Sequence, residues 1–169
     1  MTARTDPDGQ INIDTDHNCF GCGRLNQHGL RLSFVPHERG GVRTEFTPAT
    51  RFEGYDGMVH GGVISTVLDE VMAWSLYRQE TWAVTGELTV RYRSPIRVGE
   101  ATCAIGWMTG RRGRRIEMAG EIVRASDAVV LARATAVFVA VPESQAEAWR
   151  QRYLASQGQI SDHNGRDDR

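Results

Sequence analysis

One segment of this chain, Val59-His60-Gly61-Gly62-Val63-Ile64-Ser65-Thr66-Val67-Leu68-Asp69-Glu70, specifies its architecture more than any other. A histidine and two glycines open an amphipathic helix, and two acids lie in its middle. Glycines at a helix start let a ligand approach free backbone N–H groups, and the helix dipole favours developing negative charge there. The acids follow about two turns later, so a polarised carbonyl and a base for water could belong to one site. The pattern favours hydrolysis of an acyl compound.

Composition bounds the class of protein. A chain of 169 residues with 40% hydrophobic residues is most simply one domain with a core. The net charge of −1 predicts no general affinity for nucleic acid or anionic membranes. Neither a signal peptide nor a long apolar run is present, which predicts a cytoplasmic protein without membrane contact. Three cysteines, two of them close together, fit reduced thiols better than a disulfide framework.

The regions around the helix predict strands. Alternating apolar residues at 30–35 and 42–46 indicate a hairpin before it. Four more strand-like runs follow it, at residues 84–92, 101–107, 116–123 and 129–141. An antiparallel sheet wrapped around one long central helix satisfies this order, an α+β fold with the apolar helix face buried on the sheet.

The boundaries of this domain follow from composition. We expect a flexible N-terminal arm at residues 1–17, the domain at 18–142, a short C-terminal helix at 143–156 and a disordered tail at 157–169. Neither end is expected to carry chemistry.

The polar face of the central helix has two interpretations. In the first, Asp69 and Glu70 are simply solvated acids. The glycine start and the small neighbours Ser65 and Ala73 favour the second, in which another subunit or a ligand lies close against that face. Glu70 points about 100° away from Asp69 on a helix, so it is interpreted as a dimer-contact or solvated acid.

Three motifs in this order resemble a known family. Cys19-Phe20-Gly21-Cys22-Gly23 is followed by Asn26 and Gly29-Leu30, His60-Gly61-Gly62 by Asp69, and Tyr92-Arg93-Ser94-Pro95 by Val98-Gly99-Glu100. Together they resemble the hotdog-fold acyl-CoA thioesterases of the phenylacetate-degradation type, in the 4-hydroxybenzoyl-CoA thioesterase superfamily. The similarity spans residues 19–142. It implies acyl-CoA as substrate, no cofactor besides that coenzyme A, a homodimer or dimer of dimers, and sites shared between one subunit's helix and its partner.

The resemblance also implies roles for single residues. Asp69 matches the catalytic carboxylate, acting as general base on water or as nucleophile. Gly61, either alone or together with Gly62, matches the oxyanion donor, and His60 matches the residue that positions the thioester carbonyl. Thr85 falls where relatives place a small hydroxyl near the water, but simple alternation puts it on the wrong strand face unless a bulge at Gly86, strand twist or the partner brings it in.

This chain departs from the family at one position. Some relatives carry an asparagine six residues before the histidine, where this chain has Gly54, with Glu53 and Asp56 as the polar groups nearby. The missing amide puts the orientation of the water or thioester in doubt.

Arginines are the candidates for contact with coenzyme A phosphates. The turn at residues 110–115 carries four guanidinium groups, and a solvated hairpin tip is the competing interpretation. A second pair lies on a polar strand face. The candidates are Arg91, Arg93, Arg111, Arg112 and Arg114, with Arg115 completing the turn.

A second cluster raises the question of a metal. His17, Cys19, Cys22 and His28 are four possible zinc ligands at knuckle-like spacing. Zinc knuckles usually show a tighter two-part spacing, and the resemblance treats this segment as a packed lead-in to the first strand, so we expect no metal. Cys103, in an apolar strand, is expected in the core.

The favoured function is therefore an enzyme, an acyl-CoA thioesterase. The alternative is a non-catalytic hotdog protein that binds acyl-CoA or assembles with partners. The retained Asp69 favours catalysis, and the absent amide at Gly54 favours the alternative. A serine hydrolase is disfavoured because Ser65 does not lie in a Gly-x-Ser-x-Gly elbow. A hotdog dehydratase is a distant third.

Overall fold

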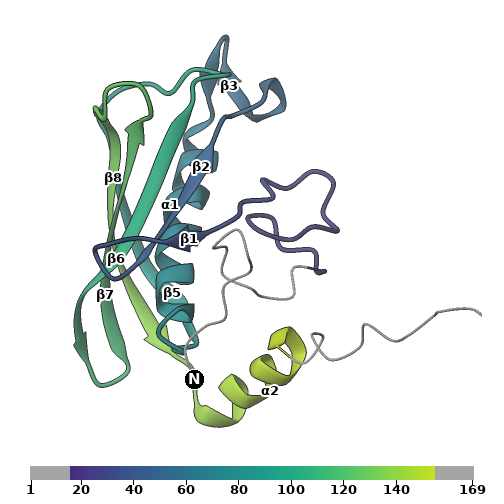
Figure 1. Ribbon diagram of the computed structural model, residues 1–169, viewed down its shortest axis with the longest axis vertical. Helices are drawn as coiled ribbons and strands as arrows, with labels where there is room; N and C mark the ends of the chain where they lie inside the picture. Colours follow the sequence, from purple (N-terminus) through teal and green to yellow (C-terminus); the bar gives the residue numbers. More distant parts are fainter. Residues whose placement is uncertain (1–15, 155–169) are drawn as a thin grey trace, which may run out of the picture.

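The computed structural model describes residues 16–154 and packs one long helix against a six-stranded antiparallel sheet (Figure 1). The strand order is β1-β2-β6-β7-β8-β5. The strands are β1 (Val35–Pro36), β2 (Val42–Phe46), β5 (Ala83–Tyr92), β6 (Thr102–Arg112), β7 (Arg115–Arg124) and β8 (Val130–Ala140). This confirms the predicted α+β class.

Smaller elements complete the fold. A two-stranded sheet of β3 (Glu53–Tyr55) and β4 (Met58–Val59), after a short 3-10 helix (Thr50–Phe52), precedes the long helix and was not predicted. Helix α2 (Glu143–Leu154) lies close to its predicted bounds. The expected tail at 157–169, and all but two residues of the expected arm at 1–17, lie outside the described residues. No helix within 16–154 has the length and apolar character needed to cross a membrane.

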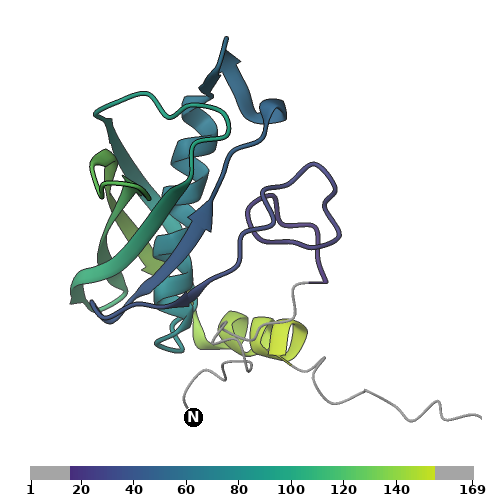
Figure 2. The same ribbon diagram turned by 45° about the horizontal axis from the view of Figure 1, so that its top comes forward.

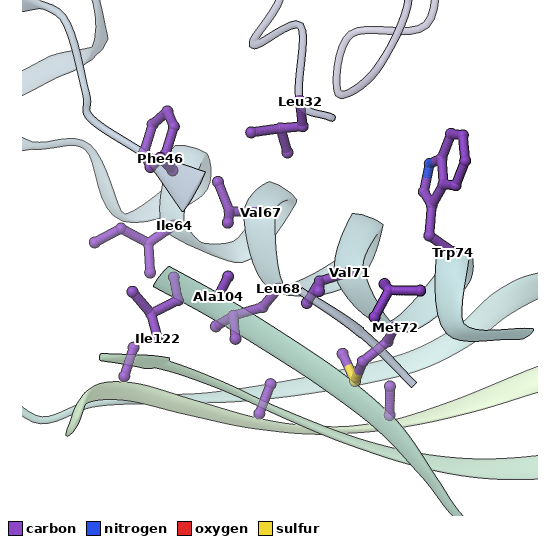
Figure 3. Close-up of a cluster of buried hydrophobic side chains, with 14 of the residues drawn as sticks. Leu32, Phe46, Ile64, Val67, Leu68, Val71, Met72, Trp74, Ala104 and Ile122 are labelled. Atoms are coloured by element: carbon purple, nitrogen blue, oxygen red, sulfur yellow. The ribbon is translucent and has the colours of Figure 1, made fainter. Parts of the chain in front are cut away.

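Helix α1 (Gly61–Tyr77) is held between the sheet and the segment that leads into β1. Figure 3 shows Leu32 on one side of the helix, and Ala104 and Ile122 of the sheet on the other. The fully buried helix residues include Val67, Leu68, Val71 and Met72. The predicted apolar face is thus correct, and burying such side chains stabilises the fold by roughly 1.5–3 kcal/mol each.

The backbones of α1 and β6 meet at Gly106. A Cβ on Gly106 would lie 2.5 Å from the Val71 carbonyl oxygen of the helix. Next to this contact the buried Ser75 hydroxyl donates to the Val71 and Gly106 carbonyls at 2.8 Å each, and accepts the Val42 N–H at 3.1 Å. One side chain therefore ties the helix to β2 and β6, and the position of the helix over the sheet is set at this point.

The strand at the sheet edge, β5, contains a bulge. Its pairing with β8 shifts between Thr85 and Glu87, so Gly86 has no partner opposite it. A bulge reverses the face on which preceding side chains project. Thr85 therefore lies on the same side of the sheet as Leu88, the side that faces the helix. Simple alternation along the strand places Thr85 on the other side, and the bulge accounts for the difference.

Two local predictions are wrong. Residues 30–34 are not a strand, and β1 is only Val35–Pro36. Leu30 and Leu32 are buried as expected, but their N–H groups donate to the carbonyls of Phe20 and Gly21 instead of a neighbouring strand. Their alternation reflects packing of the lead-in segment on α1. Cys103 is only half-buried, because Thr102 and Ala104 of β6 face the helix and Cys103 faces the other side.

The contact at Gly106 generates a stability test. Gly106→Ala should lower the free energy of unfolding by about 1–3 kcal/mol, because a methyl group there overlaps helix backbone that cannot rotate away. Gly110→Ala on the same strand is the control, since its new Cβ would meet only the Glu117 side chain, at 3.3 Å. Denaturant unfolding measures both. Equal losses for the two variants would contradict the close approach.

Candidate active site

The start of α1 presents a backbone donor that is not used by the rest of the helix. His60 is the N-cap, and its Nδ1 accepts the Gly62 N–H at 2.9 Å. The Val63 and Ile64 N–H groups donate to the His60 carbonyl. Within residues 16–154 this leaves the Gly61 N–H without an acceptor. Gly61 therefore fits the predicted oxyanion donor, whereas Gly62 does not, because its N–H is occupied by the cap.

The cap also orients the His60 ring. An Nδ1 that accepts a hydrogen bond carries no proton, so the neutral ring carries its proton on Nε2. That second nitrogen is available to donate to a bound carbonyl. The ring and the Gly61 N–H are thus two donors at the same helix end.

A strand residue fixes this helix end. The Tyr92 hydroxyl donates to the Gly61 carbonyl at 3.0 Å and lies 2.7 Å from the Ser65 hydroxyl. Ser65 in turn donates to the Gly61 carbonyl at 3.1 Å. These contacts hold the first turn of α1 against the end of β5. The sequence indicated neither role, although Tyr92 stands in one of the three motifs.

Asp69 of α1 and Thr85 of β5 are in direct contact. The Thr85 hydroxyl donates to Asp69 Oδ1 at 2.7 Å. Partial burial raises the pKa of Asp69 above its ordinary value, while the hydrogen bond from Thr85 lowers it. A raised pKa makes the carboxylate a stronger base for a water proton. The bulge at Gly86 is what brings the hydroxyl to this side of the sheet.

The helix start and Asp69 do not form one site within a single chain. Gly61 and Asp69 are eight residues apart, which is about 12 Å along a helix axis. A thioester carbonyl bound at Gly61 therefore lies beyond the reach of a water held by the same chain's Asp69. The expectation that the helix start and Asp69 of the same chain act on one substrate is therefore corrected: the two groups lie too far apart.

Gly54, where some relatives carry an amide, lies against the catalytic histidine candidate. A Cβ on Gly54 would be 3.0 Å from His60 Cα and 3.3 Å from its ring. A side chain at this position would thus crowd the cap. The nearby Glu53 carboxylate accepts the Gly57 N–H within its own hairpin. The structure offers no substitute for the amide from Glu53.

Arg91 and Arg93 lie on the face of the sheet away from α1. They line a cavity of about 570 Å³ that also includes Arg39, Arg133 and Trp107. The nearly buried Glu121 pairs with Arg39 at 3.0 Å and with Arg133 at 3.5 Å. Neither Arg39 nor Arg133 was singled out from the sequence, because the turn between β1 and β2 and the strand β8 bring them here from distant segments.

The arginines of the β6–β7 turn form a separate group. Arg115 and Glu121 are six residues apart on β7, about 20 Å of strand. Arg114 donates to the Ala140 carbonyl at 2.8 Å, and Arg115 pairs with Glu117 at 3.6 Å. Arg111 reaches the Thr81 hydroxyl at 3.4 Å, and Arg112 makes no ion pair within the described residues. The two predicted arginine groups cannot contact the same phosphate.

Glu70 is not a solvated acid. It is half-buried, and its Oε1 lies 3.4 Å from the Cys19 sulfur. Burial, reinforced by the neighbouring Cys19, raises the pKa of Glu70 to about 8. A hydrogen bond from Cys22 lowers the pKa of Cys19 and raises that of Cys22. All three cysteines are free, as predicted.

Sequence comparison relates the chain to known proteins. Residues 56–131 match the family model of the thioesterase superfamily. An uncharacterized protein of Schizosaccharomyces pombe is 29% identical over 111 residues, which are 63% of either chain. The acyl-coenzyme A thioesterase THEM4 of Xenopus laevis is 29% identical over 94 residues, 56% of this chain and 42% of that protein. The chain thus spans less than two thirds of the curated relatives it matches.

Solved structures show the same fold. The thioesterase superfamily protein RHA08564 superposes with a TM-score of 0.68 at 28% identity, over 72% of this chain and 60% of its own. The PaaI protein of the Escherichia coli phenylacetic acid degradation operon superposes with a TM-score of 0.62 at 17% identity. The match covers 67% of this chain and 81% of that protein. Protein smu.793 of Streptococcus mutans, solved bound to acetyl CoA, superposes with a TM-score of 0.61 at 18% identity. The match covers 70% of this chain and 97% of that protein. The resemblance to the thioesterase superfamily is confirmed, and the fold is the hotdog fold.

Proposed function

We propose that this protein is an acyl-CoA thioesterase whose active site combines Asp69 of one subunit with the α1 start of its partner. The observation that carries the proposal is that α1 presents two groups beside β5. One is the half-buried Asp69 carboxylate, which Thr85 holds, and the other is the Gly61 N–H, which the helix does not use. Two antiparallel copies of α1 would bring these groups together, which a single chain cannot do. The name of the Xenopus relative and the acetyl CoA bound to the streptococcal protein support a CoA thioester as substrate.

The edge of the sheet supports the assembly. β5 is ten residues long and pairs only with β8 among the described strands, so its other edge offers unpaired N–H and C=O groups. Proteins rarely leave such an edge uncovered, because it recruits further strands. Strand β5 contacts α1 through the side chains of both Thr85 and Tyr92. A second copy that pairs with β5 extends the sheet, covers this free edge and completes two equivalent sites.

The reaction would proceed at these groups. The thioester oxygen accepts hydrogen bonds from the partner's Gly61 N–H and the partner's His60. Asp69 takes a proton from water, whose oxygen attacks the carbonyl carbon. The tetrahedral oxyanion collapses, the C–S bond breaks, and the thiolate of coenzyme A leaves and takes up a proton. Attack by the Asp69 carboxylate itself, through an anhydride, is the alternative route to the same acid and thiol.

The non-catalytic alternative rests on Gly54. The family's amide is absent there, and His60 occupies the space that it would need. Catalysis is favoured because a binding protein gains nothing from a partly desolvated carboxylate beside an electrophilic carbonyl. We propose a cytoplasmic enzyme, with coenzyme A as part of the substrate.

We assign the coenzyme A phosphates to the tip of the β6–β7 hairpin. Arg111 contacts Thr81, two residues before β5, and Thr85 lies near the start of that strand. The pair Arg91 and Arg93 lies on the opposite face of the sheet from Asp69 and already shares its cavity with Glu121. The arginines of the hairpin tip are therefore better placed than Arg91 and Arg93 to contact the phosphates of a coenzyme A whose thioester lies at Asp69.

The carboxylate is tested by two variants. Asp69→Asn should keep the fold while kcat falls by about two or more orders of magnitude, because the base or nucleophile is removed. Thr85→Val should lower kcat less, since it removes only the hydrogen bond that orients the carboxylate. Thiol release from a panel of short, long and aryl acyl-CoAs measures both. Asp127→Asn, an exposed change in the β7–β8 turn, is the control. No thiol release by the wild-type chain from any acyl-CoA would favour the binding protein, and wild-type turnover that Asp69→Asn leaves unchanged would reject Asp69 as the base or nucleophile.

The oxyanion donor is tested by Gly61→Pro. Proline is tolerated at the first helical position, and His60 has φ −60° and ψ 134°, a conformation that a following proline accepts. The change deletes the N–H with little effect on the helix. Losing one such donor typically lowers kcat by about 10²–10³-fold. Gly61→Ala keeps the N–H and should retain most activity. Similar losses in the two variants would indicate a steric effect and reject the donor.

The coenzyme A assignment is tested by comparing arginine pairs. Arg111→Ala with Arg112→Ala should raise KM for acyl-CoA about tenfold, with less effect on the matching acyl-pantetheine, which lacks the nucleotide. Arg91→Ala with Arg93→Ala is the matched pair and should change KM little. The reverse ranking would move the phosphate site to the other face of the sheet.

A further inference from the structure

The residues around Cys19 bring three potential metal ligands to one point. The sulfurs of Cys19 and Cys22 and a carboxylate oxygen of Glu70 lie within 4.8 Å of one another. They come from two segments of the chain, the lead-in before β1 and the middle of α1. The mechanism proposed above uses none of the three.

The loop that carries the two sulfurs is tightly built. The Gly23 N–H donates to the Cys19 carbonyl at 3.0 Å and closes one turn of chain around the pair. A Cβ on Gly21 would overlap the Glu70 carboxyl, so the loop backbone lies directly on that side chain. Within this loop, Cys22 is 7% exposed. The donors are therefore held in place by backbone contacts, which is the preorganisation that a metal site requires.

The separation between Cys19 and Glu70 fits a tetrahedral ion. With a metal–sulfur distance of about 2.3 Å and a metal–oxygen distance of about 2.0 Å, tetrahedral geometry places sulfur and oxygen about 3.5 Å apart. Cys19 Sγ and Glu70 Oε1 lie 3.4 Å apart. Two thiolates with one carboxylate are the mixed donor set that suits zinc, whereas magnesium and calcium prefer oxygen alone.

Within residues 16–154, no arginine lines the cavity beside the cluster. The cluster forms part of the wall of a cavity of about 380 Å³, whose other lining residues are mainly aromatic and include no arginine. The chain contains no lysine. Because no arginine is among the described residues of this cavity, a divalent cation is the group that would best compensate two thiolates and a carboxylate. The cavity gives the fourth coordination position access to water.

We propose that Cys19, Cys22 and Glu70 form a zinc site that ties the lead-in segment to α1 beside Asp69. This reverses the expectation of no metal drawn from the sequence, which lacked Glu70 as a ligand. His17 lines the same cavity, but its Nδ1 accepts the Cys19 N–H, and His28 is exposed. Neither histidine is needed for the site.

The test is a cobalt titration of the full chain, purified with reductant and chelator and then freed of chelator. Wild type should bind about one Co²⁺, with a thiolate-to-cobalt charge-transfer band in the near ultraviolet and the strong visible bands of a tetrahedral ion, both lost when Zn²⁺ displaces it. This needs no variant, so misfolding cannot obscure it. Zinc should also raise the thermal midpoint of the wild-type chain.

Variants then locate the ligands. Cys19→Ser and Cys22→Ser should lose the charge-transfer band, and Glu70→Gln should weaken cobalt binding about 100-fold while keeping a sulfur band. Cys103→Ser, in the half-buried thiol on the far side of the sheet, is the control and should bind as wild type does. Failure of reduced wild type to develop a charge-transfer band at millimolar cobalt would overturn the proposal. A band that survives both Cys19→Ser and Cys22→Ser would overturn it as well.

Discussion

The fit of α1 on the sheet is the constraint on which the rest of the structure depends. At Gly106 the helix backbone touches the strand backbone, and Ser75 locks the contact with hydrogen bonds to both elements. This fixes the height and rotation of the helix. The strip that faces away from the core then runs beside β5, where Thr85 meets Asp69 and Tyr92 meets Gly61. Figure 2 shows the helix lying along the sheet, with the lead-in segment on its other side. The candidate site is a consequence of this packing.

Sequence periodicity predicted the parts that local chemistry controls. The helix and the four long strands after it follow from apolar residues at regular spacing, and α2 lies close to the bounds expected for a short C-terminal helix. The contact between Asp69 and Thr85 was predicted only conditionally. Alternation alone places Thr85 on the wrong face, and a bulge at Gly86 depends on pairing with β8, which no local pattern encodes.

The remaining differences arise from contacts between distant segments. Leu30 and Leu32 alternate like a strand but bond to the loop behind them. Glu70 looks solvated on a helical projection, yet the Cys19 loop covers it from a segment 51 residues away. Arg91 of β5 and Arg93, which follows it, join Arg39 and Arg133 only because the fold brings β8 and the β1–β2 turn to the same cavity. For Glu70 and the β5 arginine the helix or strand was correctly placed, whereas the strand expected at residues 30–34 was not; in every case the partner segment could not be identified without the fold.

The composite site is tested most directly by a hybrid dimer. Two differently tagged chains, one carrying Asp69→Asn and the other Gly61→Pro, are co-expressed and purified through both tags. If the thioester is held by one subunit and attacked from the other, each hybrid contains one intact site and one doubly defective site. Turnover should then recover to about half that of the wild-type dimer, far above either parent variant. If both groups act from the same chain, no intact site exists in the hybrid. Turnover that stays at the level of the parents would contradict the account.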